Sequence, residues 1–322
     1  MEDLREGDII LSRSDERESV LIREASDSEY SHAILYVGAA SCIESNGLGV
    51  QVQNLMRIFF NELADAIVLR LSEPVEIKSN RSITDYARQN VGMEYSASEA
   101  RLANFKKLHE AKHLNRQFCT RFVAQAYSNA NINIVANSAY CTPNDILNSE
   151  KLSVVENALR EASEAEINFY SSKNNILEEQ KDIINQILED SRNLTGVDIQ
   201  SFNQLIQFVV NNIKYDEDVQ RIFKESGYFQ LWEKEYESNP WNYSFEELRK
   251  KYPNRYFRKH VARFFYNTES QTRDRFIRTL EIYNDALKKI DSNALKDQVQ
   301  LYSKLIELSE IREKVAEKAL QE

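Results

Sequence analysis

The chain has 322 residues, 42% of them hydrophobic, and carries a formal net charge of −10 at pH 7. This length suffices for two domains, each with its own core. The acidic balance argues against nucleic-acid binding, which needs a basic surface, and no apolar run approaches the roughly 20 residues that span a bilayer.

The cysteines and the N-terminal residues give an indication of the cellular compartment. The three cysteines stand at unrelated spacings and cannot form a complete set of disulfides, which indicates a reducing environment. Residues 1–7 show neither the basic nor the apolar region of a signal peptide. We therefore expect a soluble, cytoplasmic protein without a transmembrane segment.

The first half of the chain mixes strand-like and helical patterns. Short apolar or alternating runs bounded by glycine, proline and polar residues predict strands, and apolar residues at helical spacing predict helices. We expect strands at residues 8–12, 32–37, 41–44, 50–52 and 66–71, and helices at 19–25, 82–90 and 119–129.

The second half has the pattern of helices alone, with long charged segments and helical apolar spacing. The clearest stripes are Phe276, Leu280, Tyr283, Leu287 and Ile290, and then Leu295, Val299, Tyr302 and Ile306. We interpret them as surfaces for packing between helices, with self-association through a coiled coil as the alternative. The sequence thus predicts an α+β domain over residues 1–152 and an all-α helical domain over residues 153–322.

One histidine stands where proton-transfer chemistry could use it. His32 follows a polar loop and opens the predicted strand 32–37, and the chain has only four histidines. Imidazole moves protons near neutral pH, and a strand would hold the ring rigidly. Cys119 is the best candidate for a nucleophile, because the helical pattern begins close to it and a helix N-terminus stabilises a thiolate.

A third group is needed to fix the tautomer of the imidazole. Glu44 lies on the next predicted strand. If the turn between the strands takes three residues, Ile34 opposes Glu44, and the carboxylate lies on the same face as His32, one diagonal step away. A four-residue turn would place it on the opposite face, and Asn46 is the alternative orienting group.

Several segments occur together in a definite order: Gly7-Asp8-Ile9-Ile10, Tyr30-Ser31-His32-Ala33, Cys42-Ile43-Glu44-Ser45, Gly49-Val50, Gly92-Met93-Glu94-Tyr95, the Cys119 segment and Thr142-Pro143-Asn144-Asp145-Ile146-Leu147. They resemble the circularly permuted NlpC/P60 cysteine hydrolases, with the permuted papain-like amidases of the YiiX/YaeF type as the closest branch. The resemblance covers roughly residues 4–150, and it implies a permuted papain-like fold with a small antiparallel sheet. In this family the histidine and its polar partner precede the cysteine.

The resemblance also implies roles for individual residues. Cys119 would be the nucleophile, His32 the general base and acid, and Glu44 the group that orients His32. Tyr95 matches the family tyrosine that lines the site and assists the oxyanion, together with the backbone N–H of Cys119. The family often has Ser-Glu after the cysteine, whereas this chain has Thr120-Arg121. We expect no cofactor.

Each of these residues also has a purely structural interpretation. An isolated cysteine on a helix is most often a small buried hydrophobe, and we expect this of Cys42 and Cys141. A tyrosine in the place of Tyr95 is commonly a core residue with a hydrogen-bonded hydroxyl. The ordered set of motifs favours catalytic use of Cys119 and His32 over packing.

Residues 109–113 formally match H-E-x-x-H, the motif of zinc peptidases. His109 and His113 would share one face of a helix, and Glu110 would activate water. Lys112 beside the second histidine, and the lack of a recognisable third-ligand motif downstream, favour a solvated amphipathic helix instead. We therefore expect no metal in the site.

A second signal is residues 249–260, where Lys and Arg alternate with aromatic residues. Such a stretch on an acidic protein could bind phosphate groups, an anionic lipid surface or nucleic acid. The alternative is a solvated helix end whose cations pair with nearby acids such as Glu246 and Glu247.

These observations predict a cysteine peptidase or amidase that cleaves an amide or peptide-like bond through an acyl-thioester on Cys119. Acyl transfer by the same Cys–His chemistry is one alternative, because permuted papain-like relatives include lipid acyltransferases. A non-enzymatic scaffold with a degenerate site, whose helices recruit a protein partner, is the other. The sequence does not identify the substrate.

Overall fold

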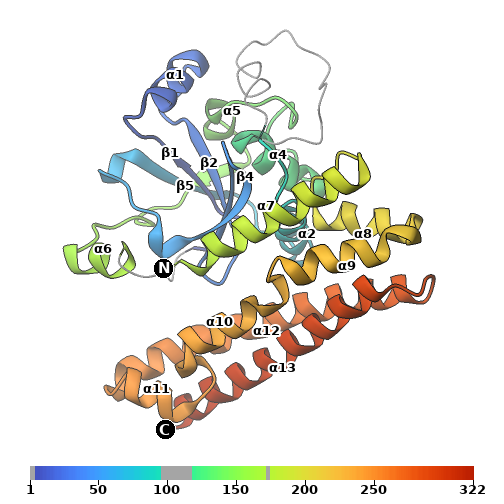
Figure 1. The fold of residues 1–322 in the computed structure, drawn as a ribbon. Helices are drawn as coiled ribbons and strands as arrows, with labels where there is room; N and C mark the ends of the chain where they lie inside the picture. Colours follow the sequence, from blue (N-terminus) through green and yellow to red (C-terminus); the bar gives the residue numbers. More distant parts are fainter. Residues whose placement is uncertain (1–3, 96–117, 172–174) are drawn as a thin grey trace. The chain divides into compact units, whose positions relative to one another are not determined.

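The computed structural model describes residues 4–95, 118–171 and 175–322 (Figure 1). The chain divides into two compact units. The first is Met1–Leu177 with Gln200–Phe202, and the second is Glu178–Ile199 with Asn203–Glu322. These units describe packing, and the division of the chain into domains 1–152 and 153–322 stays a prediction.

A six-stranded antiparallel sheet forms the frame of the first unit. Its strands are β1 (Ile9–Ser12), β2 (His32–Tyr36), β3 (Ser41–Asn46), β4 (Gly49–Asn54), β5 (Ala66–Leu71) and β6 (Leu152–Val154). They lie in the order β4-β3-β2-β1-β5-β6, and every neighbouring pair is antiparallel. All five predicted strands are confirmed. Strand β6, three residues long at the edge of the sheet, was not predicted.

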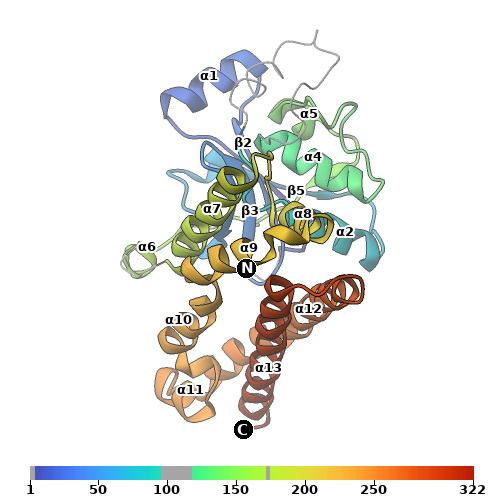
Figure 2. The ribbon, with the colours of Figure 1, turned by 45° about the vertical axis from the view of Figure 1, so that its right-hand side comes forward.

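Helices cover the sheet on both sides. Those of the first unit are α1 (Arg17–Ser26), α2 (Ile77–Gln89), α4 (Cys119–Asn129), α5 (Pro143–Leu147) and α6 (Glu164–Ser171), with the 3₁₀ turns η1 (Leu55–Arg57) and η2 (Leu63–Asp65). Helices α2 and α4 lie on one side of the sheet and α6 on the other (Figures 1 and 2). The three helices predicted for this half are confirmed.

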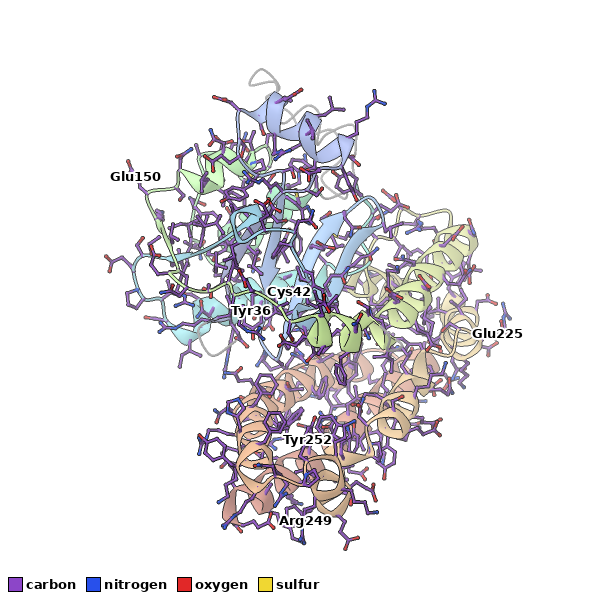
Figure 3. All side chains as sticks on the ribbon, turned by 90° about the vertical axis from the view of Figure 1, so that its left-hand side faces the viewer. Tyr36, Cys42, Glu150, Glu225, Arg249 and Tyr252 are labelled. Carbon is purple, nitrogen blue, oxygen red and sulfur yellow. The ribbon has the colours of Figure 1, made fainter. Side chains whose placement is uncertain are left out.

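Alternation along the strands divides the apolar side chains between two cores. One face of the sheet packs against α2 and α4, and Leu35 and Phe122 are wholly buried there. The other face carries a smaller cluster that includes Tyr36 and Cys42, which lie close together in Figure 3. Apolar residues of the segment 155–159 pack on this cluster. The sheet is therefore buried on both faces.

Buried polar contacts hold the start of β1. The Asp8 carboxylate is 1% exposed and accepts hydrogen bonds from Arg70 Nε at 2.7 Å and Nη2 at 2.6 Å. It also accepts one from the backbone N–H of Arg5 at 2.8 Å. The Tyr127 hydroxyl of α4 donates to the Gly7 carbonyl. The Gly7-Asp8 motif thus joins β1 to β5 and α4.

Strand β4 is joined near Gly49 to the segment that begins at Gly92 and leads to Tyr95. The Val50 N–H donates to the Met93 carbonyl at 2.8 Å, and the Gly92 N–H donates to the Val50 carbonyl at 2.9 Å. Gly49 has a φ of +100°, and a Cβ there would lie 2.5 Å from the Met93 carbonyl oxygen. Only glycine fits so close an approach in this backbone conformation.

The remaining helices are α7 (Ile176–Thr195), α8 (Phe202–Asn211), α9 (Asp216–Glu225), α10 (Leu231–Ser238), α11 (Phe245–Lys251), α12 (Arg255–Leu287) and α13 (Asn293–Gln321), with the 3₁₀ turns η3 (Ile213–Tyr215), η4 (Tyr228–Gln230) and η5 (Pro240–Asn242). Helices α12 and α13 pack along each other, and the rings of Tyr283 and Tyr302 lie 5.5 Å apart between them. The apolar stripes therefore pack within one chain. In the described part of the chain, no helix combines the length and the apolar character needed to cross a membrane.

The Gly49→Ala substitution tests the close approach of β4 to Met93. The left-handed backbone and the contact with the carbonyl oxygen are expected to lower the free energy of unfolding by about 1–3 kcal/mol, measured by denaturant unfolding. The matched control is Gly47→Ala in the adjoining turn, where the backbone is not left-handed and an added Cβ meets nothing within 4 Å. Equal stability of the two variants would contradict this account.

Candidate active site

Strand β2 and helix α4 bring His32 and Cys119 together. His32 is the first residue of β2, and Cys119 is the first residue of α4. The Cys119 Sγ lies 4.0 Å from the carbonyl oxygen of Ser31, and Cys119 is close enough to the His32 ring to help raise the pKa of the imidazole. The two side chains therefore meet where β2 begins.

The Cys119 sulfur lies at the N-terminus of α4, at the positive end of the helix dipole. Phe118 precedes α4 in an extended conformation, with φ −137° and ψ 161°, and its side chain has no acceptor to cap the first turn. The first N–H groups of a helix carry the positive end of its dipole, which favours an anion at Cys119. Cys119 is 8% exposed, so the sulfur is largely shielded from water.

The register of β2 and β3 places Glu44 beside His32. Ile34 pairs with Glu44 and Tyr36 with Cys42, as predicted for a three-residue turn. His32 Nε2 lies 2.7 Å from Glu44 Oε2. Since the carboxylate occupies Nε2, the other ring nitrogen, Nδ1, is left for the thiol.

Two amides hold the other oxygen of the carboxylate. Asn46 Nδ2 donates to Glu44 Oε1 at 2.9 Å, and Gln53 Nε2 donates to the same oxygen at 3.3 Å. Asn46, considered above as a substitute for Glu44, instead supports it. Gln53 was not predicted as part of the site; it lies two residues along β4 from Gln51, the partner of Glu44. Only the register of β3 and β4 shows that the side chains of Gln53 and Glu44 lie close together.

The two ionisable groups shift each other's pKa in opposite directions. Burial lowers the pKa of His32, but the interactions with Cys119 and Glu44 outweigh burial and raise it above 6.5. Burial raises the pKa of Glu44, but hydrogen bonds from His32, Asn46 and Gln53 bring it below 4.5. Charged His32 therefore contributes stability that is complete below about pH 6.5 and is lost as the pH rises through its raised pKa.

The other two cysteines are packing residues, as predicted. Cys42 and Cys141 are 0% and 2% exposed, and burial raises the pKa of each thiol far above its ordinary value. The Thr120 hydroxyl donates to the carbonyl of Cys141 at 2.6 Å. Both thiols therefore stay protonated at neutral pH.

The Thr120-Arg121 departure from the family pattern also has a structural explanation. The Arg121 side chain is buried, and its Nε donates to the Ala139 carbonyl at 2.8 Å. Its guanidinium lies 4.5 Å from the centre of the Phe118 ring and 4.9 Å from that of Tyr140. These contacts tie the first turn of α4 to the loop before α5, which stabilises the position of the cysteine.

Tyr95 and the motif at residues 109–113 were the other two candidates for the site. Tyr95 is half-buried at the end of the segment bonded to β4, and the N–H of the preceding Glu94 donates to Gln200 Oε1 at 2.8 Å. The motif at residues 109–113 lies outside the described residues. Within residues 4–95, 118–171 and 175–322, no three His, Cys, Asp or Glu side chains gather as a metal-binding group.

A helix that begins with cysteine, set beside an antiparallel sheet that carries histidine and a carboxylate, defines the papain-like class of domains. The order along the chain, with His32 and Glu44 before Cys119, defines its circularly permuted form. The chain belongs to the permuted papain-like amidase family YaeF/YiiX, C92, whose model matches residues 3–195. The predicted family and fold class are confirmed.

Among solved structures, the chain is similar to the crystal structure of metalloprotein yiiX from Escherichia coli O157:H7. The identity is 19% and the TM-score 0.39, and the match covers 50% of this chain and 99% of that chain. No curated protein matches the sequence.

Glu44→Gln tests the electrostatic coupling in the site. Loss of the carboxylate charge is expected to lower the pKa of His32 by at least about one pH unit, because an adjacent anion favours the imidazolium. NMR titration of the histidine ring signals measures this directly. Gln53→Ala, which keeps the charge, is the control and should give a smaller change. An unaltered His32 titration in Glu44→Gln would refute the coupling.

Proposed function

We propose that this protein is a cysteine amidase or peptidase that cleaves an amide or peptide-like bond. Its membership of an amidase family supports an amide substrate. The observation that carries the proposal is the series Cys119, His32 and Glu44, in which His32 shares a hydrogen bond with Glu44 and lies close enough to Cys119 for the cysteine to raise the pKa of the imidazole. A nucleophile, a proton carrier and an orienting group are the parts that thiol catalysis needs.

In the acylation step, His32 Nδ1 takes the thiol proton and the Cys119 sulfur attacks the carbonyl carbon. A C–S bond forms, and the electron pair of the C=O bond moves to the oxygen, where the backbone N–H of Cys119 stabilises the oxyanion. The oxyanion then collapses, the C–N bond breaks, and the imidazolium gives its proton to the leaving amine. An acyl-thioester remains on Cys119.

In the second step, the neutral imidazole takes a proton from water while the water oxygen attacks the thioester carbonyl. Collapse of the second oxyanion breaks the C–S bond, and the sulfur recovers its proton from His32. The Glu44 carboxylate stays ionised throughout and holds Nε2–H, so that Nδ1 faces the reacting atoms. Asn46 and Gln53 restrict the rotation of that carboxylate.

Tyr95 is proposed as a further oxyanion donor, because the family tyrosine lies near the cysteine and the backbone before Tyr95 is bonded to β4. We also propose that the protein acts in the cytoplasm. This is supported by its three cysteines, which are all free thiols, and by the use of one of them as a nucleophile, which requires the reduced state.

Labelling with a panel of acyl and peptide electrophiles tests the proposed nucleophile. Intact-mass measurement at neutral pH is expected to show a single adduct, which is lost in Cys119→Ala. His32→Ala should slow labelling by about 100-fold, the usual contribution of a positioned base. Cys42→Ala is the matched control and should label like the wild type. Equal labelling of Cys42 and Cys119 would favour the scaffold alternative.

The fate of the acyl-enzyme separates hydrolysis from acyl transfer. With a substrate that acylates Cys119, we expect the free acid as the product even when a primary amine or alcohol is added, because water is the proposed acceptor. Chromatography of the products measures the ratio of acid to transfer product. A transfer product that dominates at low acceptor concentration would identify an acyltransferase instead.

A further inference from the structure

A group of cations lies at one end of the second unit, where α11 ends and α12 begins; Figure 3 labels Arg249 and Tyr252 in this region. We call residues 249–268 the basic tip. It contains seven Lys and Arg and no Asp or Glu, in a chain whose net charge is −10. The basic tip therefore differs in sign from the chain as a whole.

The basic tip exposes aromatic rings among these cations. Tyr256 is 87% exposed and Phe257 is 52% exposed, both in the first turn of α12. Phe264 is 37% exposed and lies two turns after Phe257 on the same side of the helix. Exposed rings that gather in one place mark an interaction surface more often than scattered ones do. A side chain as exposed as Tyr256 projects into the solvent.

Hydrogen bonds hold the first turn of α12, which carries Tyr256 and Phe257. Arg258 is 3% exposed; its Nε donates to Glu322 Oε2 at 3.0 Å, and its Nη1 donates to the carbonyls of Tyr252 at 2.7 Å and Pro253 at 3.0 Å. The Asn254 side chain caps the helix by accepting from the N–H of Phe257 at 3.0 Å. The exposed rings therefore project from a rigid base.

Acidic neighbours neutralise only some of the cations. Glu322 pairs with Arg258 and lies 3.7 Å from Arg249, and Glu247 pairs with Lys250 at 2.5 Å. The predicted pairing with Glu247 is thus present. The charge of Glu246 also acts on Lys250, and that of Glu322 acts on Arg255. Lys251, Arg255 and Arg263 are all exposed.

Lys318 of α13 adds a further cation beside the tip, 4.8 Å from the centre of the Phe245 ring. The cations of the tip and its neighbour Lys318 therefore come from three helices, α11, α12 and α13.

We propose that the basic tip docks the protein on the surface of an anionic lipid bilayer. Lys251, Arg255 and Arg263 would approach the lipid phosphates, and Tyr256 and Phe257 would enter the head-group layer. Tyrosine and lysine or arginine suit this boundary, because each has an apolar body and a polar end. Single-stranded nucleic acid is less suited, since it requires a groove that follows the backbone, whereas Tyr256 protrudes. The proposal is independent of the proposed catalysis.

Vesicle co-sedimentation of the full chain tests the electrostatic part. Phosphatidylcholine vesicles with about 30 mol% phosphatidylglycerol should bind the wild type, whereas pure phosphatidylcholine should not, and about 0.5 M salt should release it. Neutralising the tip with Lys251→Gln, Arg255→Gln and Arg263→Gln should weaken binding by about 100-fold. The control with an equal charge change is Lys288→Gln, Lys289→Gln and Lys296→Gln, where α12 ends and α13 begins; it should bind like the wild type.

The aromatic part is tested by Tyr256→Ala with Phe257→Ala, which should weaken binding by about tenfold with little change in its salt dependence. Circular dichroism of every variant checks that the helices remain. The proposal fails if wild type binds neither vesicle, if both triple variants bind alike, or if a single-stranded RNA oligonucleotide binds more tightly than anionic vesicles in the same buffer.

Discussion

The hydrogen bond between His32 Nε2 and Glu44 Oε2 exists because β2 and β3 pair with Ile34 opposite Glu44. A slip of one residue would turn every side chain of β3 to the other face of the sheet. The carboxylate would then point into the apolar core under α4, where an unpaired charge is strongly unfavourable. The same slip would turn Ile43 out of that core, so the packing that sets the register also sets the site.

The segments that resemble the family contain two kinds of residue. A few could take part in the chemistry, and several others stabilise the backbone around them. Asp8 joins β1 to β5, and Gly49 allows Met93 to approach β4. Thr142 and Asp145 cap α5 reciprocally through hydrogen bonds of 3.1 and 2.8 Å. Rigid surroundings of this kind hold the side chains of Cys119 and His32 in place without help from a bound substrate.

Net charge proved too coarse a guide to the surface of the second unit. A value of −10 excludes a generally basic protein, but it averages over the basic tip and the acidic remainder. Electrostatic attraction acts over about one Debye length, roughly 8–10 Å in physiological salt. The local excess of cations around Tyr256 therefore matters more to a nearby charge than the net charge of the whole chain does.

The sequence by itself determined the elements whose patterns are local. Short apolar runs mark β2 and β5, the helical stripes mark α12 and α13, and the order of motifs identifies the family around His32 and Cys119. These features depend on near neighbours along the chain, so a single sequence contains them. The apolar stripes did not say which helices they join, and only the fold shows that α12 packs against α13.

The tertiary structure alone decided what depends on contacts between distant residues. It decided that the β2–β3 turn takes three residues, that Gln53 reaches Glu44, and that β6 pairs with β5 at the edge of the sheet. It also decided that Arg121 is buried against two rings rather than solvated. Register and burial follow from the packing of the whole unit, because the free energy that selects them comes from side chains far apart in the sequence.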